Sequence, residues 1–452
     1  MIEADDPLGQ SITVQHASSV AALAGFVDGF LGYRPSILAV LAAAEHDDSL
    51  TVQACAAALY LFGESPGGPA RARAQLARAA RAGLPAHARE RQFAAAVAHW
   101  AAGDIALALA LHEALVLAQP RDLVSVKLGQ YHAFNMGDSP TMLRLALHAL
   151  PAAADVPALH GMLAFGWEQC HRPDRAEAAA RQALALQPDE PWAQHALAHV
   201  MLTDGRLAEG AAFMAQASAG WQGLTSFMRC HNWWHLALFL IELGDDAAAL
   251  RLYDEQVWGV DTTCSQDQVG AVSLLARLAL AGVDVGSRWQ ALAGHLAGRT
   301  ADQVLPFLDL QYLYGLARAG RPEADTLLAN IERFAPLAPA ETRGAWQQVA
   351  VPAARGLVAH ARGLLSPADA DWPAAADALA LALPGLAGIG GSHAQRDLFQ
   401  QIQLDALQRA GRLAAVQNLL QPQANAQPQS LRLRRRLQAV AGGLGLPGLA
   451  AF

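Results

Sequence analysis

The chain contains 452 residues and carries a formal net charge of −8, with 53% hydrophobic but only 6% aromatic residues. The acidic balance argues against general binding to nucleic acids or anionic membranes. No apolar run reaches the ~18 residues that a membrane-spanning helix needs, and the acidic segment Met1–Gln10 lacks the basic and apolar regions of a signal peptide. We therefore expect a cytoplasmic protein with no nucleic-acid or membrane partner.

The apolar residues are largely alanine and leucine, which favour helices, and no segment resembles a strand. Helical patterns alternate through the first hundred residues, with a break at 66–69 (Pro-Gly-Gly-Pro), but their repeat is degenerate. We expect three regions: degenerate N-terminal helical repeats (1–102), tetratricopeptide-like repeats that carry paired histidines (103–260), and C-terminal repeats with a capping helix (261–452).

A short turn signal recurs with a period near 34 residues. Its first four occurrences are spaced by 34, 35 and 33 residues, and each lies between two helical patterns. A glycine at such a place ends a helix in the left-handed conformation, and this period is typical of tetratricopeptide repeats. The sequence therefore predicts an all-α, tetratricopeptide-like solenoid, a strongly curled superhelix of antiparallel helix pairs. The turn residues are Gly103, Gly137, Arg172-Pro173, Gly205, Gly244, Gly320 and Gly411.

The same signals predict the two helices, A and B, of each repeat. Residues 421–430 are rich in glutamine and proline and are expected to form a loop. The expected A helices are 122–136, 156–170, 190–203, 226–243, 267–281, 304–319, 343–364 and 393–410. The expected B helices are 140–149, 173–186, 206–219, 246–258, 286–298, 322–334, 372–383 and 412–420.

Two pairs of histidines recur at the spacing of one repeat. His195 and His199 lie four residues apart on one A helix, so they share a face. His231 and His235 follow 36 residues later on the next A helix with the same spacing. Neighbouring helices pack about 8–10 Å apart, so the four imidazoles are expected to converge, with a displacement of up to one turn. Steps of one repeat extend the row to His160, His195, His231 and Asp267.

Converging imidazoles suit two kinds of chemistry. They can bind a divalent transition metal, with His195, His199, His231 and His235 as ligands. The same four side chains can act as general acids or bases, with Asp267 as the group that orients them. A third interpretation is structural, since single histidines on inner helix faces often only bond to a neighbouring helix. Neither pair carries the glutamate of an HExxH motif, which disfavours a zinc protease of that type.

Aromatic residues crowd the same segments and are expected to pack in the core or to line a pocket. Cys230 precedes His231, but adjacent helical residues point about 100° apart, so we expect a core residue rather than a nucleophile. The expected ligand-binding residues of this region are His160, Trp192, Asn232 and Trp234.

Two polar features follow in later A helices. Asp309 lies in an apolar segment, where a carboxylate requires a partner. Ser392 and Gln395 match a capping box, and Arg396 next to them is a candidate partner for Asp309, for Asp267 or for an acidic ligand. We add Asp309, His393 and Arg396 to the expected ligand-binding residues. The basic run at 432–436 is expected to be a solvated helix face that could contact an anion.

Four strings of residues resemble the tetratricopeptide repeat protein 38 family. They are His-Ala-Leu-Ala-His-Val at 195–200, Cys-His-Asn-Trp-Trp-His at 230–235, Leu-Arg-Leu-Tyr-Asp at 250–254 and Gly-Gly-Ser-His-Ala-Gln-Arg-Asp at 390–397. The similarity spans about residues 155 to 410. It implies a curled helical-repeat fold and no particular reaction. The family tends to carry asparagine after Gly-Gly-Ser, where this chain has His393.

Three functions are compatible with these patterns. The first is a protein that binds a small molecule or a short peptide in a concave groove lined by histidine and tryptophan. The second is an enzyme, with or without a metal, that uses the histidines and Asp267. The third is a scaffold for protein partners, the usual role of such repeats. Scaffold grooves usually offer lysine, arginine and asparagine, whereas this chain has only one lysine, Lys127. Histidine pairs flanked by tryptophans favour an enclosed small-molecule site over an open peptide groove.

Overall fold

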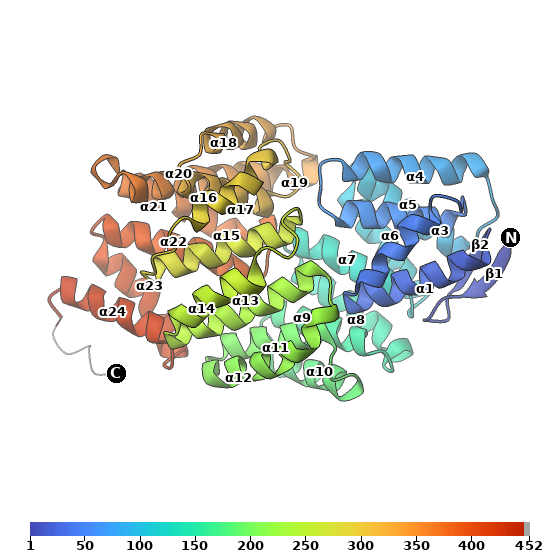
Figure 1. Ribbon diagram of the computed structural model, residues 1–452, viewed down its shortest axis with the longest axis horizontal. Coiled ribbons are helices and arrows are strands. Elements are labelled where there is room, and N and C mark those ends of the chain that lie inside the picture. The colour runs from blue at the N-terminus through green and yellow to red at the C-terminus, as the bar shows by residue number, and fades with distance from the viewer. Residues whose placement is uncertain (447–452) are drawn as a thin grey trace. The chain divides into compact units, whose positions relative to one another are not determined.

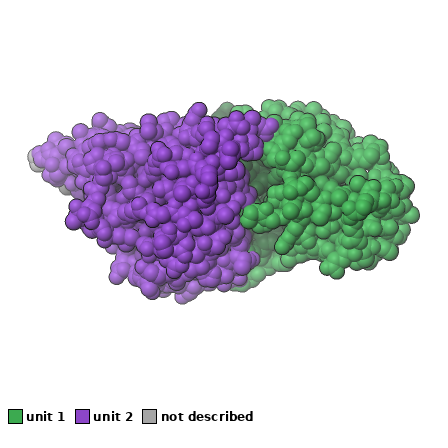
Figure 2. Space-filling model, turned by 90° about the horizontal axis from the view of Figure 1, so that it is seen from above, with its two compact units in different colours: residues 1–197, 220–228 green, residues 198–219, 229–452 purple. Residues whose placement is uncertain are grey.

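A computed structural model of the chain describes residues 1–446. These residues form two compact units, each described separately below (Figure 2). The first unit comprises residues 1–197 and 220–228, and the second comprises residues 198–219 and 229 onward. The expected boundaries at 102/103 and 260/261 remain predictions.

A short β-hairpin opens the first unit, contrary to the expectation that the chain holds no strand. Strands β1 (Ile2–Asp5) and β2 (Ser11–Val14) pair antiparallel, with Ile2 opposite Val14 and Asp5 opposite Ser11. The carboxylate of Asp6 accepts the backbone N–H groups of Leu8 and Gln10 at 2.9 Å and so fixes the turn. Strands of four residues are too short to give a periodic signal in a chain dominated by alanine and leucine.

Helices that follow one another in the first unit pack as antiparallel neighbours. Helix α11 begins in this unit and continues into the second. The helices are α1 (Ala17–Gly32), α2 (Ala39–Ala43), α3 (Leu50–Phe62), α4 (Gly68–Ala82), α5 (Ala88–Ala102), α6 (Ile105–Ala118), α7 (Leu123–Asn135), α8 (Ser139–Ala153), α9 (Pro157–Gln169), α10 (Pro173–Leu186) and α11 (Pro191–Thr203), with the 3₁₀ turn η1 (Pro35–Leu38).

The second unit continues the series, although most of η2 and the first three residues of α13 belong to the first unit. Its α-helices are α12 (Leu207–Ala217), α13 (Ser226–Leu243), α14 (Asp246–Leu252), α15 (Ser265–Leu280), α16 (Arg288–Leu296), α17 (Pro306–Arg318), α18 (Glu323–Phe334), α19 (Ala340–Gly344), α20 (Val351–Leu365), α21 (Trp372–Ala382), α22 (His393–Arg409), α23 (Leu413–Ala426) and α24 (Leu431–Gly443). Short 3₁₀ or π segments extend several of them: η2 (Ser218–Gly223), η3 (Tyr253–Val257), η4 (Ala297–Arg299), η5 (Ala345–Ala350), η6 (Pro367–Asp369) and η7 (Leu383–Ile389).

The predicted repeat is confirmed by the helix starts. Helices α7, α9, α11 and α13 begin at residues 123, 157, 191 and 226, which are 34, 34 and 35 residues apart. All six predicted turn glycines have positive φ, as a left-handed helix end requires. In the repeat without a turn glycine, His171 takes this conformation instead, with φ 57°. The chain is an all-α helical-repeat protein built from antiparallel helix pairs.

One expected loop is right only for residues 427–430, which lie outside any helix. Helix α23 continues to Ala426 and includes Pro422, although residues 421–430 were expected to be irregular. The side-chain amide of Gln421 donates to Asn425 one turn later, at 2.9 Å. Glutamine and alanine favour helices, and here they outweigh the proline.

The segment Trp372–Ile389 also differs from the expectation that no apolar run could span a membrane. Together α21 and η7 are long and apolar enough to do so by length and composition. A single segment of this kind is weak evidence for a membrane protein, because core helices pass the same test. In the structure, Ala375, Ala376 and Leu379 are fully buried, and α21 packs against α20 as the second helix of a pair.

The second unit brings its last helix back to its first ones (Figure 1). Arg432 of α24 donates to Glu242 of α13 at 2.7 Å. Arg277 of α15 likewise pairs with Asp397 of α22 at 2.8 Å. Residues more than a hundred positions apart are thereby joined across the unit, as a tightly curled repeat requires.

Candidate functional site

Three histidines of the second unit lie side by side on two consecutive A helices. His199 is on α11, and His231 and His235 are on α13. The ring centroids of His199 and His235 are 4.5 Å apart, and those of His231 and His235 are 4.9 Å apart. One ring nitrogen of His231 and one of His235 lie within 4.8 Å of each other. We name these three side chains the histidine cluster.

The histidine cluster is shielded from solvent. His199, His231 and His235 are 1%, 9% and 0% exposed. Burial, followed by the charge of His199, lowers the pKa of His231 to about 3. His231 is therefore a neutral imidazole at pH 7, with a lone pair on one nitrogen.

Trp234 is the aromatic support of the cluster. Its ring stacks on His231 with an interplanar angle of 9° and meets His235 edge to face at 4.8 Å. The guanidinium of Arg277, on α15, lies 5.7 Å from the ring centroid of Trp234. Because Trp234 is only 1% exposed, these contacts restrict the orientation of two of the three imidazoles.

Asp267 lies where the repeat predicts, near the start of α15, and is 2% exposed. It accepts a hydrogen bond from the thiol of Cys230, with 3.7 Å between Sγ and Oδ2. Burial and the Asp267 carboxylate raise the pKa of Cys230, so the thiol stays protonated. Cys230 is 3% exposed and is a core residue, as expected.

Several buried polar atoms around α13 and α17 have no hydrogen-bond partner among residues 1–446. They include both amide atoms of Asn232, the indole nitrogen of Trp234, one oxygen of Asp309 and the side-chain amide of Gln311. Asn232 and Asp309 are fully buried and Gln311 is 1% exposed. Native proteins rarely leave such groups unsatisfied without a water, ion or ligand nearby. Three of these four residues, Asn232, Trp234 and Asp309, are expected ligand-binding residues.

The remaining expected residues of α9 and α11 belong to the first unit. His160 bonds through Nε2 to the carbonyl of Ala154 at 2.8 Å, which is the structural role considered for a single histidine. Trp192 stacks on His195 with 4.3 Å between centroids, and His195 is one helical turn before His199 on the same helix. The roles of Trp192 and His195 remain predictions.

The polar features of the late helices are only partly as expected. Ser392 and Gln395 form the predicted capping box of α22. The pairing of Arg396 with Asp309 is wrong: Asp309 accepts from Gln303 at 3.2 Å and has no ion pair among the described residues. Arg396 bonds to the carbonyl of Gly391. His393 is half-buried at the start of α22, and its role in ligand binding remains a prediction.

Arg277 is a residue of the site that the sequence analysis did not single out. It is 4% exposed and joins Trp234 to Asp397. Its signal was available, because an arginine within the apolar stretch 272–280 requires a partner for the same reason as Asp309.

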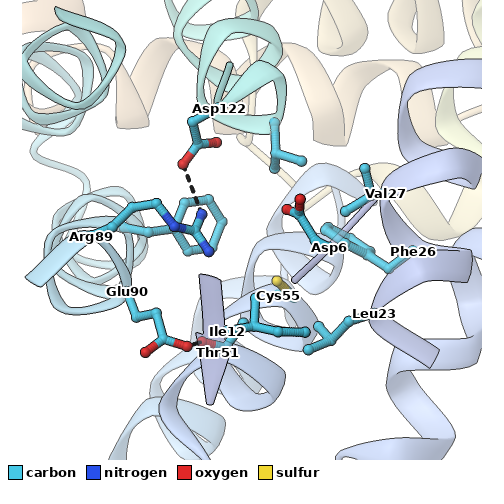
Figure 3. Close-up of a pocket in the computed structure, with 12 residues that line it drawn as sticks. Asp6, Ile12, Leu23, Phe26, Val27, Thr51, Cys55, Arg89, Glu90 and Asp122 are labelled. Carbon is cyan, nitrogen blue, oxygen red and sulfur yellow. Dashed lines mark hydrogen bonds and ion pairs between the residues drawn. The ribbon is translucent and has the colours of Figure 1, made fainter. Parts of the chain in front are cut away.

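A pocket in the first unit also went unpredicted (Figure 3). Arg89 and Asp122 form an ion pair of 2.9 Å on its polar wall, and Leu23 and Phe26 belong to its apolar wall. It leaves about 30 Å³ to the centres of water-sized molecules, which is room for one or two waters.

No protein-family model matches the chain. Among solved structures, the chain is similar to the human IFIT1 dimer with PPP-AAAA, at 13% identity and a TM-score of 0.43, over 89% of this chain and 88% of that chain. It is similar to the P58(IPK) TPR domain at 11% identity and a TM-score of 0.20, over 72% of this chain and 99% of that chain. Similarities this low say nothing about what this chain binds.

Proposed function

We propose that this helical-repeat protein binds a divalent transition metal ion through His199, His231 and His235. The observation that carries the proposal is the pair of ring separations, 4.5 and 4.9 Å, among three buried imidazoles from two helices. Imidazole suits Zn, Cu, Fe and Ni, and a neutral ring offers the lone pair that coordination needs.

The separation of His231 and His235, two of the three rings, approaches that of metal ligands. Zinc binds imidazole nitrogens at about 2.0–2.1 Å in a tetrahedral arrangement, which places two ligand nitrogens about 3.4 Å apart. Nitrogens of His231 and His235 lie within 4.8 Å of each other, so small rotations of the rings would complete the contact. The stacked Trp234 limits the freedom of both rings and keeps them beside each other, so only small rotations are available to them.

The fourth ligand position separates two forms of the proposal. His195, one turn before His199 on α11, is predicted to fill it, which would give a closed site. Without His195 the position is open to water or a small molecule, as in catalytic zinc sites. The unsatisfied polar atoms of Asn232 and Trp234 favour a bound small ligand near α13, and metal-assisted catalysis is the second candidate function.

Metal content of the purified chain tests the proposal. After loading with zinc and dialysis, we expect about one zinc per chain, and loss of most of it when His199, His231 and His235 are all changed to alanine. The matched control is the double change His112→Ala and His132→Ala, because these rings are also buried, at 0% and 1% exposure, and lie 5.7 Å apart in the first unit. A wild-type chain without zinc, or equal loss in both variants, would refute the proposal.

The single change His195→Ala then distinguishes the two forms. A closed site predicts a weaker zinc affinity in this variant. An open fourth position predicts an unchanged affinity and a water that small ligands can displace.

The other expectations remain proposals. Relationship to the tetratricopeptide repeat protein 38 family rests on the strings at 230–235 and 390–397. The cytoplasmic location and the lack of nucleic-acid or membrane partners rest on composition and charge. Binding of a peptide or protein in a concave groove rests on the usual role of such repeats.

A further inference from the structure

The basic run of helix α24 divides into two faces. Arg434 and Arg435 are exposed, as expected for a solvated face. Arg432 and Arg436, four residues apart, share the opposite face. The side chain of Arg432 is 13% exposed and bonds to Glu242, and Arg436 is half-buried. The sequence expectation of a wholly solvated run is therefore wrong for two of the four arginines.

Helices α24 and α22 contribute to one apolar cluster, through Leu433 of α24 and Leu404 and Leu407 of α22. Helix α22 carries Asp397 and Asp405 two turns apart. Both carboxylates already accept hydrogen bonds from other side chains. Asp397 accepts from Arg277 at 2.8 Å and from Gln401 at 2.5 Å, and Asp405 accepts from His360 at 2.9 Å and from Arg409 at 2.6 Å.

Arg436 alone in this group lacks a partner. Among residues 1–446 it makes no hydrogen bond or ion pair, and its Nη2 is buried without an acceptor. Burial and the charges of Arg432 and Arg409 lower the pKa of Arg436 to about 10, against the opposing charges of Asp405 and Asp397. At pH 7 it is nonetheless a cation, half removed from water and next to two others.

The local charges do not balance. The cations are Arg277, Arg409, Arg432 and Arg436, and the anions are Glu242, Asp397 and Asp405. Burial lowers the pKa of His360, so this histidine adds no charge at pH 7. Four cations and three anions leave one positive charge, and Arg436 is the cation without a counter-ion.

We propose that Arg436, flanked by Arg432 and Arg409, binds a small oxyanion, a phosphate or a carboxylate. A guanidinium offers a planar fork of donors that matches both groups. The side chain of Arg409 is 43% exposed, and we infer that an anion approaches Arg436 from that side. This site is distinct from the histidine cluster and does not depend on the metal proposal.

Calorimetric titration of the full chain with inorganic phosphate, and separately with succinate, tests this site. We expect the wild type to bind at least one of the two anions, and Arg436→Gln to raise the Kd at least about tenfold, since a charged hydrogen bond contributes about 1.5–3 kcal/mol. Arg434→Gln is the matched control, because it removes the same charge from the exposed face of the same helix. The Arg434→Gln change should leave the Kd within about twofold of the wild-type value, because exposed surface charges contribute little.

The outcomes separate the possibilities. Tighter binding of phosphate points to a phosphoryl group on the natural ligand, and tighter binding of succinate points to a carboxylate. No binding of either anion, or equal weakening by both glutamine variants, would overturn the proposal. Should Arg436→Gln fail to fold by circular dichroism, Arg436→Lys keeps the charge without the fork and should still weaken binding severalfold. The zinc content of each variant should equal that of the wild type, so this test is independent of the histidine cluster.

Discussion

Replacing Trp234 with alanine should lower the free energy of unfolding of the second unit by about 3–5 kcal/mol, the range for removal of a large buried aromatic side chain. The indole is 1% exposed and contacts His231, His235 and Arg277. Its loss leaves a cavity beside the imidazoles, so zinc affinity should fall as well. Urea unfolding followed by circular dichroism measures the first effect, and zinc titration measures the second.

Trp346→Ala is the control for this prediction. Trp346 is 2% exposed in the same unit and packs against Phe334. Its replacement should cost a similar free energy of unfolding and leave zinc affinity unchanged. If both variants lose zinc equally, Trp234 supports the fold alone. A cost below about 1 kcal/mol for Trp234→Ala would contradict the packing described here.

Replacing Asp309 with asparagine should stabilise the chain at neutral and alkaline pH. Asp309 is fully buried, and burial raises its pKa from 3.8 to about 8 although Gln303 donates to it. The folded chain keeps this proton up to about pH 8, whereas the unfolded chain loses it near pH 4. Between these values the folded state binds more protons, so stability falls as pH rises.

The size of this effect follows from the shift. A change of about 4 pKa units corresponds to a contribution on the order of 5 kcal/mol above pH 8. The Asp309→Asn variant should match the wild type near pH 4 and exceed it progressively up to pH 8 in urea unfolding. Asp377→Asn removes an exposed carboxylate paired with Arg412 and should leave the stability nearly unchanged, because exposed ion pairs contribute little. Equal pH dependence in wild type and Asp309→Asn would show that Asp309 ionises in the folded chain.

The repeat could be predicted from the sequence because its signals are local. A glycine such as Gly137 ends one helix and a proline such as Pro157 opens another, and neither depends on distant contacts. The hairpin of β1 and β2 depends on pairing between two short strands. The helical end of α23 depends on neighbouring residues that favour a helix despite Pro422. Neither feature can be predicted from local sequence patterns.

The histidine cluster could be predicted in part. The offset of 36 residues places His199 next to His235, and the structure has them 4.5 Å apart. The same offset from His231 leads to Asp267. The carboxylate of Asp267 accepts a hydrogen bond from the thiol of Cys230. The rotation of each helix about its axis decides which neighbour faces which, and spacing along the chain does not specify it.

Contacts between distant helices could not be predicted. Arg277 meets Asp397 and Arg432 meets Glu242 because the second unit curls back on itself. The expected pairing of Arg396 with Asp309 applied the same idea and is wrong, whereas its pairing with Asp267 or with an acidic ligand remains a prediction. These contacts depend on the curvature of the second unit. The packing angles of many helix pairs set that curvature, and no single motif specifies it.

X-ray absorption at the zinc edge of the zinc-loaded chain tests the central claim most directly. We predict at least three imidazole nitrogens at about 2.0–2.1 Å from the metal, and loss of this signal when His199, His231 and His235 are changed to alanine. A spectrum with sulfur ligands near 2.3 Å, or with oxygen ligands alone, would contradict a metal site at the histidine cluster.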